Sequence, residues 1–331
     1  MQVAAIVSVS STKGSETDSA GSRSRILGGL HAAQSQVELH VLGRSLLDRA
    51  LGTFERLGVD RPTVVPVAPG LVELASSLPS LPRRSFFAWE GTLGRLITEG
   101  AERIILATTD IYTDLDYQEL LRFHGERGAA FTQVYSADKP LNIAVVETDA
   151  LRHGSGPYKM KLAGLMARHE RFCFDGYVNR LRKPSDFIQL VSDALNRRCC
   201  LRPQGTEMSP GVWFAAGAEV DSSCVITGPA FIGAETTVAA GCTIAEGAAI
   251  EYGCKIDCGT TVEQSWILPG TYVGLGLCVR RSIVSGRKML HLDRKTEITI
   301  TDRRLIGAIR SLPFLGTPDK SLEGAQVVNG V

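Results

Sequence analysis

The chain has 331 residues, and a single hydrophobic core rarely grows beyond about 250–300 residues, so the length favours two domains. Basic and acidic residues nearly balance, giving a formal net charge of +1, and no basic stripe stands out, which argues against a nucleic-acid partner. No run of about 18 apolar residues is present, so we expect no membrane span. The short apolar stretch at residues 3–9 lacks the basic start of a signal peptide, and we expect a cytoplasmic protein.

Strand and helix patterns alternate over the first 200 residues. Apolar runs predict strands in VAAIVSV (3–9), from Thr63, in RIILATTD, in AAFTQVYSA and in NIAVVETD. Amphipathic spacing predicts helices at about 45–57, after a turn at Gly43-Arg44, at about 89–99, and in LDYQELLRFHGERG, where Gly128 ends the helix. This alternation predicts a Rossmann-like, doubly wound α/β domain over residues 1–200.

A period of six residues organises the chain from Phe214 to Leu268. The recurring apolar residues are Phe214, Val220, Ile226, Ile232, Val238, Ile244, Ile250, Ile256, Val262 and Leu268. A small residue precedes most of them by two positions, and a glycine follows several by three. This period is typical of a parallel β-helix built from hexapeptide turns, with aliphatic side chains inside and glycine at the corners. We expect roughly four coils over residues 205–290, with a one-residue register slip around Pro269-Gly270.

The segment after the coils, residues 291–331, is expected to form a capping strand and a tail. The stretch EITITD (297–302) alternates like an edge strand and would cover the open end of the solenoid. Three of the eight cysteines, Cys224, Cys242 and Cys254, fall in the small inward position, so we expect free thiols there. The large aromatic residues of the repeat mark either an interdomain seam or an interface with a partner, and the sequence leaves both readings open.

Several stretches occur in the order found in one enzyme family. They are GRSLLDRALGTFERLGV, ATTDIYTDLDYQELLRFHGERGA, AVVETD, CFDGYVNRLRKPSDFIQLVSDAL and SWILPGTYVGLG. In this order they resemble the sugar-1-phosphate nucleotidylyltransferases (NDP-sugar pyrophosphorylases), which often carry a C-terminal left-handed β-helix. The resemblance implies a nucleotidyltransferase domain, a left-handed solenoid and a role in sugar-nucleotide metabolism feeding polysaccharide synthesis. The family's reaction transfers a nucleotidyl group to a sugar phosphate with the help of Mg²⁺.

Carried over residue by residue, the resemblance assigns two elements of a nucleotide site. The loop after the first strand contains Ser10, Lys13 and Gly14, which could form a small anion cradle, although the family's glycine–threonine–arginine order is absent. Asp110 ends a central strand at the position of the family's first metal carboxylate, and Thr109 replaces the usual glycine before it. Asp110 is read either as a retained ligand or as a relic that caps the following turn.

Two further elements depart from the family pattern. The segment between AVVETD and CFDGY is too short for the family's sugar-binding elements, and we read Lys159 and Lys161 as solvated lysines of a helix. The position of the second metal carboxylate falls on Arg180, and Arg182 follows where the family has glycine. A positive charge at a ligand position repels a divalent cation, because carboxylate charge is what holds Mg²⁺.

We therefore interpret the chain as a catalytically impaired homologue, a pseudoenzyme without an assigned catalytic residue. Its weak nucleotide-binding set is Ser10, Lys13, Gly14, Thr109 and Arg180, with Asp110 as a relic of a metal site. The expected partners are a nucleotide or sugar nucleotide, and a second copy or another protein bound through the β-helix. Mg²⁺ is required only under the alternative, an active nucleotidylyltransferase. A hexapeptide acyltransferase is less favoured, because residues 205–290 contain no histidine to act as a base.

Overall fold

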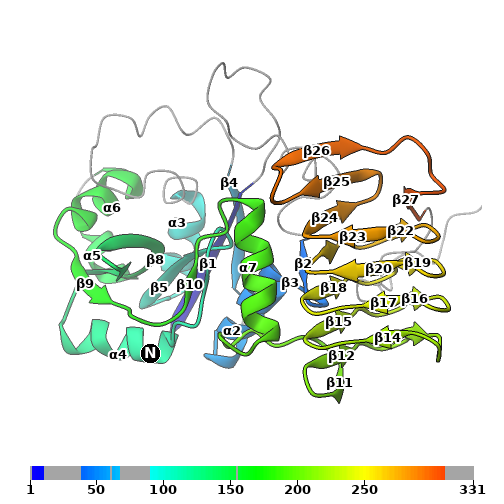
Figure 1. Cartoon of the computed structure of the whole chain (residues 1–331). Helices are drawn as coiled ribbons and strands as arrows, with labels where there is room; N and C mark the ends of the chain where they lie inside the picture. Colours follow the sequence, from blue (N-terminus) through cyan, green and yellow to red (C-terminus); the bar gives the residue numbers. More distant parts are fainter. Residues whose placement is uncertain (1, 11–38, 60–61, 68–89, 154–155, 310–331) are drawn as a thin grey trace, which may run out of the picture.

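The structure is a computed structural model that describes residues 2–10, 39–59, 62–67, 90–153 and 156–309. An N-terminal α/β part stands beside a stack of short parallel strands (Figure 1). The N-terminal sheet has six strands in the order β4-β1-β5-β8-β7-β9. Their bounds are β1 Val3–Ser10, β4 Thr63–Val67, β5 Arg103–Thr108, β7 Phe131–Ser136, β8 Lys139–Glu147 and β9 Glu170–Cys173.

The sheet is mixed. Strand β1 pairs in parallel with β4 and β5, as the alternating sequence predicts, but β8 runs antiparallel to both β5 and β7. The reason is the short connection between β7 and β8. Ala137 and Asp138 form it, with φ of 46° and 58°, which is the backbone of a two-residue hairpin and leaves no room for a crossover helix.

Helices pack against both faces of this sheet. Within the described residues the helices are α2 Leu46–Arg56, α3 Glu90–Thr98, α4 Tyr117–Glu126, α5 Thr148–Arg152, α6 Tyr158–Met166 and α7 Pro184–Leu195, the last of which packs against the solenoid instead. Alternate residues of β5 face opposite sides, so that Leu106 packs with α3, α5 and α6 while Ile105 packs with α2 and α4. The predicted strands and helices of this part are therefore confirmed within a few residues, with the turn before α2 at Leu42-Gly43 rather than Gly43-Arg44.

The C-terminal part is a solenoid, by which we mean the stacked coils of residues 206–308. Its eight-, five- and four-stranded sheets are mostly parallel, which is consistent with a β-helix. The first coils contain β12 Val212–Phe214, β13 Glu219–Val220, β14 Val225–Ile226, β15 Ala230–Ile232, β16 Thr237–Val238 and β17 Thr243–Ile244. The later coils contain β18 Ala248–Ile250, β19 Lys255–Ile256, β20 Thr261–Glu263, β21 Trp266–Ile267, β22 Thr271–Val273, β23 Cys278–Arg280 and β24 Ser282–Ser285.

The six-residue period places aliphatic side chains inside the solenoid, as predicted. Ile232, Ile250 and Ile267 stack in register on successive coils, and each is fully buried. The small residues two positions earlier also hydrogen-bond: Thr236 Oγ1 donates to the Glu251 carbonyl at 2.8 Å, and Cys254 Sγ to the Leu268 carbonyl at 3.2 Å. All eight cysteines are free thiols.

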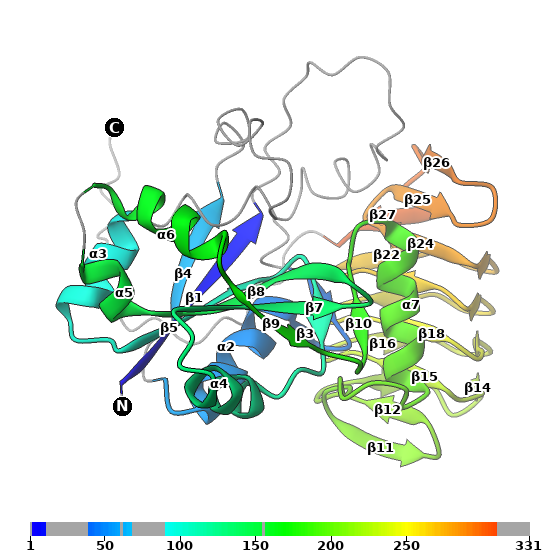
Figure 2. The ribbon, with the colours of Figure 1, turned by 90° about the vertical axis from the view of Figure 1, so that its left-hand side faces the viewer.

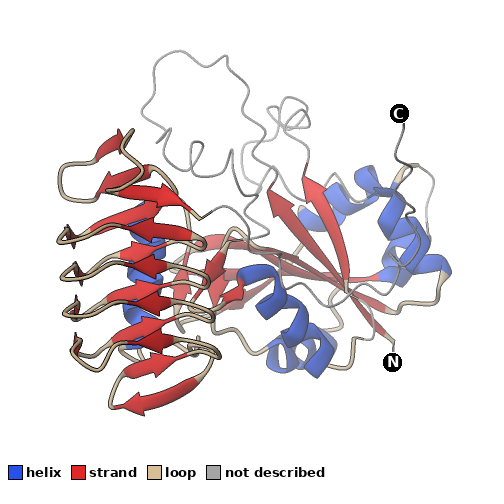
Figure 3. Cartoon of the chain, turned by 90° about the vertical axis from the view of Figure 1, so that its right-hand side faces the viewer, coloured by secondary structure: helices blue, strands red, loops and turns tan. Residues whose placement is uncertain are grey.

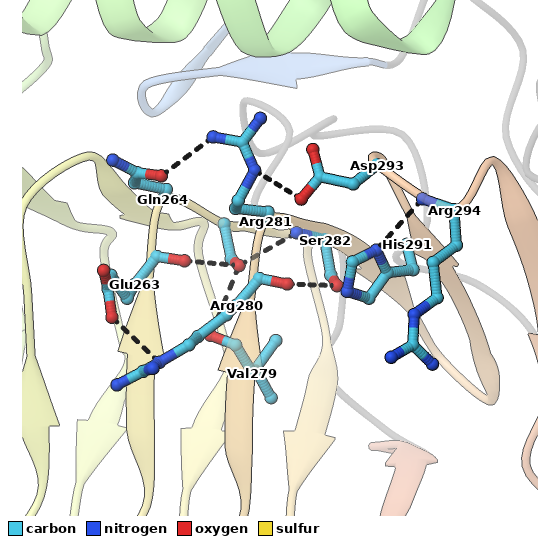
Figure 4. Close-up of polar contacts among 10 residues, drawn as sticks. Glu263, Gln264, Val279, Arg280, Arg281, Ser282, His291, Asp293 and Arg294 are labelled. Carbon is cyan, nitrogen blue, oxygen red and sulfur yellow. Dashed lines mark hydrogen bonds and ion pairs between the residues drawn. The ribbon is translucent and has the colours of Figure 1, made fainter.

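The register slip lies earlier than predicted, and it occurs twice. Ile250 pairs with Ile267 instead of Leu268, and Ile267 pairs with Val284, so each of these two coils is one residue shorter than the coil from Ile232 to Ile250. Leu268 faces outward, into the seam with the N-terminal part. Figure 4 shows the shortened corner around Gln264, Arg281 and Ser282. At this corner the Ser282 amide donates to the Ser265 hydroxyl at 3.0 Å, and that hydroxyl donates to the Glu263 carbonyl at 2.7 Å. The Ser265 hydroxyl thus hydrogen-bonds with backbone groups at the corner where the coil is one residue shorter.

Antiparallel strands close parts of the solenoid ends. Strands β11 Thr206–Ser209, β25 Lys288–His291 and β26 Thr296–Thr299 extend the eight-stranded sheet, and β27 Ile306–Ala308 pairs with β22. Strand β26 is the edge of its sheet, which confirms the edge strand predicted in EITITD. At the opposite end the inward residues Val220 and Ile226 are only half-buried.

Helix α7 lies between the two parts with its axis along the stack of coils (Figures 1 and 2). From the other side, Figure 3 shows the stacked strands in front of this helix. Phe187 of α7 stacks on Trp266 with ring centroids 6.0 Å apart, and Phe231 belongs to the same apolar cluster. Trp213 packs against that cluster as well, whereas Phe214 packs inside the solenoid. Most large aromatics of the repeat therefore mark the seam.

Candidate functional site

The carboxyl ends of β1 and β5 form the centre of the candidate site. Ser8 Oγ donates to the Ala107 carbonyl at 3.1 Å, and the Thr109 amide donates to the Ser8 carbonyl at 3.1 Å. The Asp110 amide donates to Thr108 Oγ1 at 3.2 Å. These contacts fix the backbone where the strands end, which is where open α/β sheets bind ligands.

Thr109 carries a buried hydroxyl at this edge. Its side chain is 7% exposed, and its Oγ1 has no hydrogen-bond partner among the described residues. A buried hydroxyl without a partner costs free energy, on the order of 1–3 kcal/mol. Thr109 therefore has a buried hydroxyl without a described partner at the end of β5, and its place in the nucleotide-binding set stays a prediction.

A short ribbon of two strands brings the backbone of Arg180 back towards the end of β5. Strand β6 (Tyr112–Thr113) pairs antiparallel with β10 (Val178–Asn179), and Tyr112 lies opposite Asn179. Asp110 lies shortly before β6, and Arg180 directly follows β10. Because the two strands are antiparallel, both residues lie at the same end of the ribbon. Continuing the register sets Arg180 opposite Ile111.

The Arg180 backbone is held by a local polar network. The Asn179 side chain accepts from the Leu181 amide at 3.1 Å and donates to the Asp186 carbonyl at 2.7 Å. The Asp186 carboxylate accepts from the amides of Arg182 and Lys183, both at 2.9 Å, and so caps α7. Leu181 has a φ of 42°. This network fixes the direction in which the Arg180 side chain leaves the ribbon.

The Arg180 guanidinium lies partly buried beside β8. Its Nη1 donates to the Pro140 carbonyl at 3.3 Å. Burial lowers the pKa of Arg180 below its usual value, and the positive charge of Arg182 lowers that pKa further. Both effects would be relieved by an anion bound here, because an opposite charge favours the ionised guanidinium.

The charged side chains of this edge bear on whether it could hold a divalent cation. Among the described residues, no three His, Cys, Asp or Glu side chains are arranged to hold a metal. The Arg180 guanidinium lies against the Pro140 carbonyl of β8, and its positive charge opposes the approach of a second one. Asp114 is already engaged, since it accepts from Tyr112 Oη at 3.0 Å and from the Cys200 amide at 2.8 Å.

Other predicted site residues fall outside what the structure describes. Lys13 and Gly14 lie outside the described residues, and for Ser10 the description covers the end of β1 but not the side chain. The same holds for the Lys159 side chain. Lys161 was expected to be a solvated lysine, but its Nζ donates to the Leu151 carbonyl at 2.9 Å and so fastens α6 to α5.

Sequence reasoning missed Ser8, Asn179 and the ribbon that β6 and β10 form. Ser8 has a weak signal, as a hydroxyl inside an otherwise apolar strand. Asn179 has none, because a two-residue strand carries no readable alternation.

The chain matches no model of a known protein family, and no curated protein matches it significantly. Each helix that the structure describes is too short or too polar to cross a bilayer.

Proposed function

We propose that the chain is a sugar-nucleotidyltransferase-like protein of sugar-nucleotide and polysaccharide metabolism that binds a nucleotide or sugar nucleotide without Mg²⁺-dependent transfer. In this proposal the N-terminal part is a Rossmann-like nucleotidyltransferase domain, and the solenoid is a left-handed β-helix that serves self-association or binding of a protein partner. The observation that carries it is the β6–β10 ribbon, in which Arg180 directly follows the residue paired with Tyr112, so that its backbone returns to the end of β5.

The binding mode follows from the chemistry of the edge. The phosphate oxygens of the ligand would accept from the Arg180 guanidinium, which forms bidentate contacts with phosphate in many proteins. The Thr109 hydroxyl would supply a further donor. A bound phosphate would also lower the cost of holding Arg180 partly buried beside Arg182.

Isothermal calorimetry tests this mode directly. Nucleoside triphosphates and sugar nucleotides are titrated into the full chain with Mg²⁺ and with a chelator. We expect the same affinity in both conditions and at least a tenfold loss in Arg180→Gln, with Arg168→Gln as a control on an exposed arginine outside the edge. Heat that appears only with Mg²⁺ would refute metal-independent binding, and no heat with any ligand would remove the proposal.

The alternative is an active nucleotidylyltransferase, and it is favoured by the place of Asp110 at the end of a central strand. Release of pyrophosphate over a panel of sugar phosphates and nucleoside triphosphates separates the two functions. Turnover that Asp110→Asn abolishes would establish the enzyme and overturn our preferred proposal. Self-association is tested separately, by sedimentation velocity of the full chain over a range of concentrations.

A further inference from the structure

The strands β14, β17, β20 and β23 form one side of the solenoid, and we call their outward surface the four-stranded face. Side chains alternate along each strand, so outward residues flank the residue that points into the core. Two charged residues of the face pair with each other, since Arg280 Nε lies 2.9 Å from Glu263 Oε2. The uncharged outward residues are Val225, Thr227, Thr243, Ala245, Thr261 and Cys278. The face therefore costs little to bury, because small side chains lose little conformational entropy.

The eight-stranded side of the solenoid is already covered by the N-terminal part (Figure 1). Glu251, which follows β18, is fully buried there and accepts from the Leu42 amide at 2.7 Å and from the Gly43 amide at 2.9 Å. These two residues form the turn between β2 (His40–Val41) and β3 (Arg44–Ser45). A further partner of the solenoid must therefore use one of the two remaining sides.

The five-stranded side differs from the four-stranded face in its charges. Its outward row contains, in register on successive coils, Glu219, Thr237, Lys255 and Tyr272. Asp257 also lies on this side, where it accepts from the Tyr272 hydroxyl at 2.8 Å. Long and charged side chains cost more entropy and desolvation on burial than small uncharged ones. The four-stranded face is therefore the better surface for a protein partner.

Charge is distributed unevenly along the solenoid. Residues 206–263, which form the first coils, contain eight acidic residues and one basic residue, Lys255. Residues 264–309, which complete the stack, contain eight basic residues and three acidic ones. The solenoid therefore has an acidic end, at β13 and β14, and a basic end, at β23 to β26.

This polarity decides how two solenoids can lie side by side. In a parallel pair the two acidic ends lie together, and bringing like charges together is unfavourable. In an antiparallel pair the acidic end of each copy lies beside the basic end of the other. Such a pair is related by a two-fold axis, which is the commonest symmetry of soluble oligomers.

An antiparallel pair joined through the four-stranded face has a defined register. Strand β14 of one copy lies over β23 of the other, and β17 lies over β20. Val225, which is 59% exposed, then meets the partner's Cys278, which is also exposed. In the same row Thr243 meets the partner's Thr261. The row of each copy is thus covered by an uncharged row of the other.

The corner beside this face adds an attractive contact between copies. Glu246, Gln264 and Arg281 lie there on successive coils: the Gln264 amide donates to the Glu246 carbonyl at 3.1 Å, and Arg281 Nη1 donates to Gln264 Oε1 at 3.1 Å. The antiparallel arrangement brings Glu246 of each copy within one coil of the partner's Arg281. Opposite charges at this distance favour association and fix its orientation.

We propose that two copies of the chain pair through the four-stranded face, with their solenoids antiparallel and the acidic end of each beside the basic end of the other. This inference rests on the self-association included in the proposed function, and it specifies the surface and the orientation. Four short strands are a small surface compared with the standard interface of about 800 Å² per partner. We therefore expect a reversible dimer that weakens as salt screens the charges.

Cross-linking tests the orientation. In the full chain the exposed Cys173 and Cys200 are changed to serine, and Val225→Cys is added, so that the face carries one thiol on β14 and the native Cys278 on β23. Three strand spacings of about 4.8 Å separate these strands in one copy. A bismaleimide with a two-carbon spacer therefore joins the two positions only between copies. We expect covalent dimers in which mass spectrometry finds the peptide of position 225 linked to that of position 278.

Two matched controls change the side of the solenoid or the pairing. Thr237→Cys, at an exposed residue of the five-stranded side, replaces Val225→Cys and should give no link to Cys278. The background without an added cysteine should give no link between two Cys278 residues, because the antiparallel pair holds them at opposite ends. A dominant link between the two Cys278 residues, or equal linking with Thr237→Cys, overturns the proposal.

Sedimentation velocity measures the dimer of the otherwise unchanged chain. We expect the dissociation constant to rise at least tenfold between about 50 and about 500 mM NaCl, and Glu246→Lys to raise it at least threefold at the lower salt. Glu126→Lys makes the same change of charge at an exposed residue of α4 and should leave the dissociation constant unchanged. A dimer that is insensitive to salt, or an equal effect of the two variants, refutes the pairing by charge.

The outcomes separate this inference from the proposed function. A chain that stays monomeric at every concentration removes both this inference and the proposed self-association. A dimer without a link between positions 225 and 278 removes this inference alone. Nucleotide binding measured by calorimetry is independent of both, since Arg180 lies in the N-terminal part.

Discussion

Replacing Gly43 with alanine should destabilise the protein more than the same change at Gly58, and the difference measures how closely the two parts fit. Both glycines have a φ of 87°, so alanine meets the same left-handed strain of about 1 kcal/mol at either position. At Gly43 a Cβ atom would also lie 2.9 Å from Gln204 Cβ and 3.1 Å from Phe231 Cζ, whereas at Gly58 nothing lies within 4 Å. Overpacking of this kind costs about 1–3 kcal/mol.

We therefore expect a loss of about 1 kcal/mol for Gly58→Ala and about 2–4 kcal/mol for Gly43→Ala. Urea unfolding followed by circular dichroism measures both, with the free energy of unfolding extrapolated to water. The Gly43 amide is retained in the variant, so the difference reports the contact with Phe231 and Gln204 rather than a lost hydrogen bond. Equal losses for the two variants would show that the turn does not press against the solenoid.

Two further changes test the solenoid core and a buried histidine. Ile250→Ala removes a fully buried side chain between two stacked isoleucines, and it should lower the free energy of unfolding in urea by about 3–4 kcal/mol. The control Val225→Ala changes a residue that is 59% exposed, and it should lower that free energy by less than about 0.5 kcal/mol. Similar losses in the two variants would argue against a packed interior. Burial lowers the pKa of His124 to about 4 although Glu147 lies 3.3 Å away, so the folded state favours the neutral ring. Its contribution to stability is therefore present above about pH 6.5 and lost as pH falls towards 4. The urea midpoint should fall over this range, and the fall should be smaller in His124→Gln.

The regular part of the solenoid could be predicted from the sequence, because one aliphatic residue in six is a strong and local signal. The position of the register slip could not. Leu268 and Ile267 are both apolar neighbours, and either could continue the series on sequence alone. The structure selects Ile267 because the corner at Gln264, with a φ of 45°, closes the coil with one residue fewer.

The candidate site was only partly predictable, for a different reason. Asp110 and Thr109 follow a long apolar strand, so their place at its carboxyl end could be read from the sequence. The approach of Arg180 depends on a pairing of two-residue strands across 65 positions, from Thr113 to Val178, which no local pattern encodes. Glu251 was missed because an acid at an outward position of the repeat reads as solvent-exposed until the N-terminal part covers it.

The length of α7 has a consequence for how this chain can change. A helix of 12 residues is about 18 Å long, and the five strands β12, β15, β18, β21 and β24, at about 4.8 Å spacing, stack to about 19 Å. The helix and the stack of strands are therefore about equally long. Repeat arrays usually grow or shrink by duplication or deletion of a coil. Here an added coil would have a strand that α7 does not cover, and a deleted coil would leave one turn of α7 without a strand to pack against. The size of the array is therefore set by its neighbour, and we expect it to vary less than that of a free-standing repeat protein.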